Sequence, residues 1–151
     1  MPEGGVTHRM TAKEYLKQIW WVDREINEKM SELEYLQTKA EGLGGSGSQG
    51  AQSKGNTKDK ISAIVIKIVD LQTYINMQTD KLIDLRTKIT KQICKMRDQK
   101  SRVILSCRYI RHMKWEQIEK ELHYEQRTLM RIHRNALKEF EAMYPQIRKL
   151  K

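Results

Sequence analysis

A seven-residue repeat of apolar side chains constrains this chain more than any other feature of its sequence. Large apolar residues recur at every seventh position, namely Ile61, Ile68, Ile75, Leu82, Ile89 and Met96. Ile64, Leu71 and Leu85 fill intervening positions of the same face, and Gln78 and Gln92 are its polar exceptions. A repeat of this period is typical of a coiled coil. It predicts a helix of about 40 residues, which would be about 60 Å long.

A second heptad pattern lies earlier in the chain. Its apolar positions are Tyr15, Ile19, Val22, Ile26, Leu33, Leu36 and Ala40, with Lys29 as the misfit. The segment TAKE at 11–14 has the form of a capping box, in which Thr11 is the N-cap and Glu14 reaches back to it. We therefore predict a helix that begins after Thr11. Residues 1–9 are expected to form a disordered tail.

A glycine-rich segment, GLGGSGSQGAQSKGN at 42–56, separates the two heptad patterns. It holds six of the eight glycines and cannot bury a core. Natural loops and engineered linkers share this composition. We expect a flexible loop that closes residues 10–97 into an antiparallel helical hairpin. The alternative is an intermolecular coiled coil with exchanged helices, and the same heptad face suits a homodimer.

Beyond Asp98 the heptad is replaced by three short helical patterns. The first contains Val103, Ile104, Cys107 and Ile110; the second contains Trp115, Ile118 and Leu122; the third contains Leu129, Ile132, Ala136, Leu137 and Phe140. Pro145 ends the third pattern, so 145–151 are expected to be a tail. The predicted fold is all-α, with a helix-turn-helix domain over 98–144 following the hairpin.

The third short pattern separates cations from apolar residues. At 100° per residue, Arg127, Arg131, Arg134 and Lys138 fall within an arc of about 60°, opposite the apolar positions. The surrounding residues 100–151 hold 13 basic and 6 acidic side chains, in a chain with a net charge of +10. Such a stripe can neutralise several DNA phosphates, so double-stranded DNA is the expected partner. The alternative is a basic face that is simply solvated.

Three segments of this region resemble region 4 of bacterial sigma factors. They are LSCRY at 105–109, WEQI at 115–118 and RIHRNAL at 131–137. The layout of the chain also resembles the ArpU-like late-gene regulators of phages and prophages. The resemblance implies that Gln126, Arg127, Met130 and Arg131 face the major groove, and that Thr128 and Arg134 contact phosphate. Because nothing matches sigma region 2, it implies a regulator that works with RNA polymerase assembled elsewhere.

The chain departs from the sigma pattern at three positions around the turn. Glu119 replaces the usual alanine of the first helix, His123 replaces the turn glycine, and Glu125 replaces the usual Ser or Thr N-cap. We expect His123 to adopt a conformation that glycine accepts more easily. Loss of the cap is expected to cost about 1 kcal/mol, although an acidic residue still complements the helix dipole.

Three functions remain open from the sequence. A sequence-specific transcription regulator is the leading hypothesis, followed by a phage small terminase subunit, which also joins a helix-turn-helix to oligomerising helices. The third is a coiled-coil adaptor that does not bind DNA. We expect no enzyme activity, since neither a Gly-rich phosphate loop nor a nucleophile elbow occurs.

The remaining motifs predict neither a cofactor nor a membrane anchor. Cys94 and Cys107 lie in helical patterns without CxxC spacing, and His112, His123 and His133 fit no common zinc signature. We therefore expect reduced thiols that are buried or half-buried, and no metal. No apolar run approaches a membrane span and the N-terminus has no signal-peptide core, so a cytoplasmic protein without membrane contact is expected.

Overall fold

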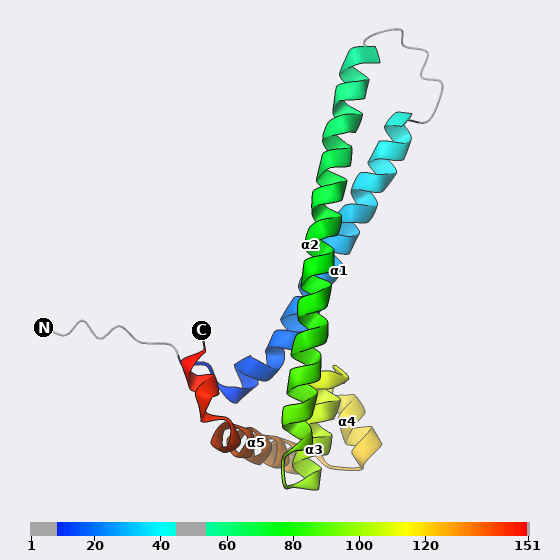
Figure 1. Ribbon diagram of the computed structural model, residues 1–151. Coiled ribbons are helices and arrows are strands. Elements are labelled where there is room, and N and C mark those ends of the chain that lie inside the picture. Colours follow the sequence, from blue (N-terminus) through cyan, green and yellow to red (C-terminus); the bar gives the residue numbers. More distant parts are fainter. Residues whose placement is uncertain (1–8, 45–53, 151) are drawn as a thin grey trace, which may run out of the picture. The chain divides into compact units, whose positions relative to one another are not determined.

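The computed structural model describes residues 9–44 and 54–150 of the chain (Figure 1). Their helices are α1 (Ala12–Gly44), α2 (Lys54–Cys94), α3 (Gln99–Leu105), the π-helix η1 (Ser106–Ile110), α4 (Trp115–Leu122), α5 (Gln126–Met143) and the 3₁₀-helix η2 (Pro145–Lys149). These residues contain no strand, which confirms the predicted all-α class. None of the helices in the described ranges is both long and apolar enough to cross a membrane.

The chain divides into two compact units. The C-terminal unit comprises Met1–Trp21 and Asp84–Lys151, and the two-helix unit comprises Val22–Ile83. Both long helices therefore contribute to both units: α1 passes from the first to the second, and α2 returns. Each unit is described by itself below.

In the two-helix unit, the later part of α1 lies beside the earlier part of α2 (Figure 1). The Tyr74 hydroxyl donates a hydrogen bond to the Glu25 carboxylate and joins the two helices. Val22, Ile26 and Ile64 are buried, whereas the other heptad positions are only partly covered: Leu33, Leu36, Ala40, Ile61, Ile68, Leu71, Ile75 and Leu82. All of these belong to the predicted heptad faces. The hairpin within one chain, rather than exchanged helices, stays a prediction.

The two long helices extend into both ends of the glycine-rich segment 42–56. Helix α1 continues to Gly44, and α2 begins at Lys54. Helix propagation adds one backbone hydrogen bond for each residue ordered, which offsets the low helix propensity of a terminal glycine such as Gly42. The middle of the predicted loop lies outside the described residues, as does most of the expected tail at 1–9.

Helix α1 begins with the predicted capping box. The Glu14 N–H donates to Thr11 Oγ1 at 3.2 Å, and the Thr11 N–H donates to Glu14 Oε2 at 3.4 Å. The two side chains thus accept hydrogen bonds from backbone donors that have no partner within the helix. The four-residue motif alone therefore identified where α1 starts.

Aromatic packing ties both long helices to the core of the C-terminal unit. Phe140 is fully buried, with ring centroids 6.0 Å from Tyr15 and 4.9 Å from Tyr144. Gln92, a polar exception to the heptad, accepts the Tyr15 hydroxyl at 2.8 Å through its side-chain oxygen. Its backbone carbonyl accepts the Tyr144 hydroxyl at 3.0 Å. The side-chain oxygen and the backbone carbonyl of Gln92 therefore both have hydrogen-bond partners, although Gln92 occupies a heptad position.

Charged side chains close the turn between α2 and α3. Arg102 Nη1 donates to the Met96 carbonyl at 2.6 Å, which satisfies an acceptor just beyond the end of α2. Asp98 caps α3 by accepting from the Ser101 N–H at 3.0 Å and from the Ser101 hydroxyl at 2.7 Å. Hydrogen bonds from Ser101 lower the pKa of the Asp98 carboxyl. Glu139 of α5 accepts from the Arg97 N–H at 3.1 Å and holds the same turn.

Two sequence expectations about the C-terminal unit need correction. Residues 145–149 form η2 rather than a tail, and Ile147 is only 2% exposed. Pro145 ends α5 as expected, but its fixed φ also suits the first residue of a new helical turn. Val103, placed in the apolar pattern of 103–110, is 38% exposed. The first short helix is in fact α3 followed by η1, and the change to a wider helical turn alters which side chains face inward.

Candidate nucleic-acid interface

A small core joins the segments that carry the candidate interface. Ile104 of α3, Cys107 of η1, Ile118 of α4 and Leu129 of α5 form one buried cluster. Trp115 and Leu122 of α4 also pack against it. Because α3, η1 and α4 pack around Leu129, they support the side of α5 that carries this residue. Its other side faces solvent.

The turn between α4 and α5 has the geometry expected of a tight interhelical turn. His123 follows α4 with φ 57° and ψ 38°, in the left-handed region. This confirms that His123 adopts a backbone conformation favoured by glycine. Glu125 is the N-cap of α5, and its side chain makes no capping hydrogen bond. The first N–H groups of α5 are therefore left without a side-chain partner from the N-cap.

Helix α5 has a packing face and a cationic face. The buried residues are Leu129, His133, Ala136 and Phe140, whereas Arg127, Arg131, Arg134 and Lys138 are exposed. We call the latter four the cationic stripe. Within an α-helix these two sets lie on opposite sides, so the faces predicted from residue spacing agree with the burial seen in the structure.

The cationic stripe differs from the other arginines of the C-terminal third because its side chains have no partner among residues 9–44 and 54–150. Within the described part of the chain, no hydrogen bond or ion pair involves its four side chains. The other arginines each contact the protein: Arg102 at the Met96 carbonyl, Arg108 at the Met113 carbonyl, Arg111 at Glu121 and Arg148 at Glu141. The charges of the stripe are thus not compensated within the fold.

The other residues predicted to contact DNA have different surroundings. Gln126 is exposed at the start of α5, and Thr128 is partly buried. Met130 is partly buried because it packs against the core cluster. The structure therefore brings Gln126 and Arg127 together at the exposed start of the helix, while Met130 has a packing role that its family position did not indicate.

His133 is a core residue of α5 that the predicted packing face did not include. It is 8% exposed, its Nε2 lies 2.7 Å from the Tyr109 hydroxyl, and the Trp115 ring meets it edge-on at 4.7 Å. Burial, together with the positive charges of Lys13 and Arg108, lowers the pKa of His133 to about 4. Its position four residues after Leu129 on the same helix was the available signal.

The Tyr109–His133 pair has one consistent protonation state at neutral pH. Burial raises the pKa of Tyr109 to about 12, so the phenol keeps its proton. With both groups neutral, the tautomer of His133 decides whether the phenol donates to Nε2 or the Nε2–H donates to the phenolic oxygen. This buried bond links η1 to α5 and holds the supporting segment against the candidate recognition helix.

The cysteines and acidic residues do not form a metal centre in the described residues. There, no group of three or more His, Cys, Asp or Glu side chains could hold a metal ion. Cys107 is buried and Cys94 is exposed, and both are free thiols. Cys94 thus lies outside the buried or half-buried class expected from its helical pattern.

A family model matches residues 45–141, which is more than half of the chain. The family is described as a protein of unknown function (DUF1492). The chain belongs to this family. The match covers all of α2, α3, η1 and α4 and nearly all of α5, so it includes the core cluster and the cationic stripe. No curated protein matches the sequence. No solved structure matches this DUF1492 protein either.

Proposed function

We propose that this DUF1492 protein is a sequence-specific DNA-binding transcription regulator with a sigma-region-4-like helix-turn-helix. In this proposal α4, the turn at His123 and α5 form the DNA-binding motif, and α5 enters the major groove. The chain would act on phage or prophage promoters together with host RNA polymerase. Membership of a phage-associated family supports that setting.

The observation that carries the proposal is the uncompensated cationic stripe of α5. Four exposed cations share one helix face, opposite four buried residues, and lack partners among the described residues. On α1, Lys29 forms an ion pair with Glu32, three residues later. The only acidic residue at such a spacing from the stripe is Glu141, three residues after Lys138, and it pairs with Arg148 instead. Duplex DNA supplies the missing negative charge at one phosphate per about 1.7 Å.

Roles within α5 follow from position along the helix. Gln126 and Arg127 lie at its exposed start, where side chains can reach base edges; Gln pairs with adenine and Arg with guanine. Arg134 and Lys138 lie farther along the stripe and are assigned to phosphates. Arg131 lies between the two groups and is assigned to the major groove.

Fluorescence anisotropy tests whether the cationic stripe binds DNA phosphates. The measurement is binding to a mixed-sequence duplex over a range of salt concentrations. Lys138→Ala should weaken binding to all sequences and reduce the salt slope by about one. Arg86→Ala on α2 is the matched control, because it also removes one exposed cation. No complex at low salt, or equal losses for both variants, would refute the proposal.

Selection of duplexes from a randomised pool tests the sequence-specific part. The unmodified chain should enrich one motif, and Arg127→Ala should relax the preference at one position by about 1–3 kcal/mol. Lys138→Ala should leave the enriched motif unchanged. Enrichment of no motif by the unmodified chain would reduce the proposal to sequence-independent binding.

The oligomeric state separates this proposal from the two other functions inferred from the sequence. A monomer, or a homodimer through the coiled-coil face, agrees with a regulator, whereas a ring of many subunits by light scattering would favour a small terminase subunit. An adaptor that does not bind DNA would retain all partner binding after neutralisation of the cationic stripe.

A further inference from the structure

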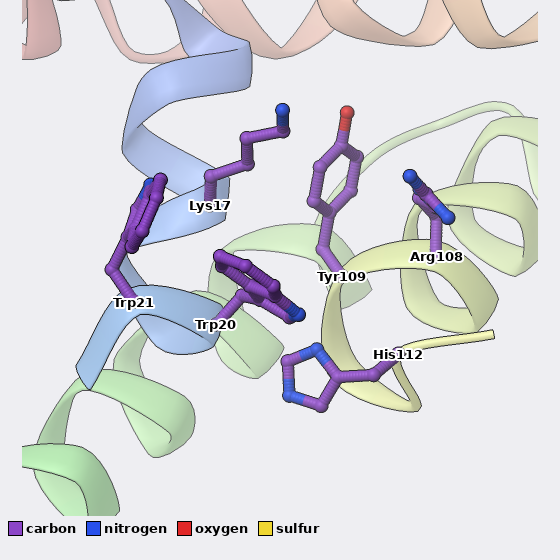
Figure 2. Close-up of a pocket in the computed structure, with 6 residues that line it drawn as sticks. All are labelled: Lys17, Trp20, Trp21, Arg108, Tyr109 and His112. Atoms are coloured by element: carbon purple, nitrogen blue, oxygen red, sulfur yellow. The ribbon is translucent and has the colours of Figure 1, made fainter. Parts of the chain in front are cut away.

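A pocket of about 190 Å³ in the C-terminal unit lies on residues that the proposed DNA contacts do not use. One wall comes from α1, through Lys17, Trp20 and Trp21. The other comes from η1, through Arg108 and Tyr109, and from His112, two residues after the end of η1. Figure 2 shows Lys17 and Trp20 extending from α1 toward Tyr109 and His112. The two walls are about 90 residues apart in the sequence.

Two backbone irregularities build the second wall. Residues 106–110 form a π-helix, with the Arg111 N–H bonded to the Ser106 carbonyl at 3.0 Å. His112 then adopts φ 55°, in the left-handed region. Single π-turns and strained non-glycine residues concentrate at functional sites. Here both occur in the segment that presents Arg108, Tyr109 and His112 to one pocket.

The side chains that line the pocket belong to a narrow chemical range. Of the described residues in its walls, all are aromatic, imidazole or cationic, and none is acidic or aliphatic. Trp20 and Trp21 are 40% and 63% exposed, and their rings meet edge-on at 4.7 Å. A groove that docks a partner helix would instead present Leu, Ile or Met anchors.

We propose that this pocket binds one unpaired nucleotide, with its base stacked on an indole and its phosphate held by Lys17 and Arg108. Stacking suits any base because every base has a π-face, and the cations supply attraction to the phosphate. Arg108 is held in place by its hydrogen bond to the Met113 carbonyl at 2.9 Å and by the Trp115 ring at 4.8 Å. The nucleotide could be free or part of a single strand.

This inference does not rest on the proposed reading of duplex DNA by α5. Tryptophan fluorescence of the full chain reports on the pocket directly, because Trp20 and Trp21 are two of its three tryptophans. Titration with a short oligothymidylate should quench the fluorescence. An abasic oligonucleotide of the same length keeps the phosphates and should not. A mononucleotide that quenches at equal affinity would identify a free nucleotide as ligand, and tighter oligonucleotide binding would identify a strand.

Variants separate the pocket from the rest of the surface. Trp21→Ala should weaken oligothymidylate binding about five- to hundredfold, as expected for the loss of one stacked base. Tyr35→Ala is the matched control, since Tyr35 is also an aromatic residue of α1 and is also 63% exposed. Lys17→Ala should lower the salt slope by about 0.7, the value for one single-strand phosphate contact, whereas Lys60→Ala should not.

Three results would overturn the inference, and the first two concern the oligonucleotide titrations. One is the absence of quenching by both the mononucleotide and the oligothymidylate. The other is equal binding by the abasic strand together with no effect of Trp21→Ala, which would indicate general electrostatic attraction. The third is binding of an acidic, aromatic peptide when neither the mononucleotide nor the oligothymidylate binds, which would make the pocket a peptide site. Arg131→Ala should weaken duplex binding and leave the quenching intact, so failure of the two proposals is distinguishable.

Discussion

The two units of this DUF1492 protein use the same kind of helix and bury it to very different extents. In the C-terminal unit, Ile104, Ile118, Leu129 and Phe140 are fully buried, and the polar groups near them are hydrogen-bonded. In the two-helix unit, most heptad positions are only partly covered, and α2 exposes large apolar side chains: Val65, Ile66, Val69, Met77 and Ile83. Several packed helices can enclose a side chain, whereas two helices cover one stripe each.

This contrast indicates where the stability of the chain resides. Burial of a large aliphatic side chain stabilises the fold by about 1.5–3 kcal/mol, and partial burial by proportionately less. Helices in water are sustained mainly by packing rather than by propensity. The C-terminal unit should therefore hold the candidate recognition helix rigidly, and the two-helix unit should open at a lower free energy.

The largest predicted effect is a loss of stability in the C-terminal unit, which is the better packed of the two. Leu129→Ala should lower its free energy of unfolding by about 3–4 kcal/mol through lost burial and a residual cavity, whereas Leu36→Ala in the two-helix unit should cost less than about 1.5 kcal/mol. All three tryptophans lie in the C-terminal unit, so fluorescence reports on it, and circular dichroism reports on both. Equal shifts in denaturant midpoint for both variants would contradict the comparison.

A smaller effect comes from the buried imidazole. The pKa of His133 is about 4 in the folded unit and near 6.5 when unfolded, so below pH 6.5 the unfolded chain binds more protons. The stability of the C-terminal unit should therefore fall as pH falls, by about 2 kcal/mol between pH 7.5 and 5. His133→Gln should flatten this dependence in denaturation curves followed by fluorescence.

The two-helix unit supplies the internal control for this pH effect. Residues 22–83 contain no histidine, so the part of the circular dichroism transition that fluorescence does not follow should shift little over the same pH range. A pH dependence of the C-terminal unit that persists in His133→Gln would assign the effect to other groups.

The smallest predicted effect is the change in stability caused by a substitution to glycine. This change should be stabilising in the C-terminal unit and destabilising in the two-helix unit. His123→Gly should stabilise the C-terminal unit by about 0.5–1 kcal/mol, because His123 has φ 57° and glycine adopts that conformation without a steric penalty. Ala63→Gly at an exposed position within α2 should destabilise the two-helix unit by about 1 kcal/mol. Thermal melts followed by fluorescence and circular dichroism would measure both; a loss of stability in His123→Gly would show that its side chain has a role beyond the turn.

The sequence predicted the features that depend on neighbouring residues. The TAKE segment identified the start of α1, and the heptads identified both long helices. The substitution of glycine by histidine predicted the left-handed turn at His123. Helical spacing also predicted that Arg127, Arg131, Arg134 and Lys138 would share one face, because side-chain direction repeats every 3.6 residues whatever the fold.

Tertiary structure decided the features that depend on distant segments. Only packing shows that Ile147 is buried, that Met130 faces the core, and that the Tyr109 hydroxyl meets His133. The pocket that joins Trp20 to His112 also depends on a π-turn, which periodicity does not reveal. Spacing along one helix fixes which residues share a face, whereas what that face meets is decided by how separate helices pack around a common core.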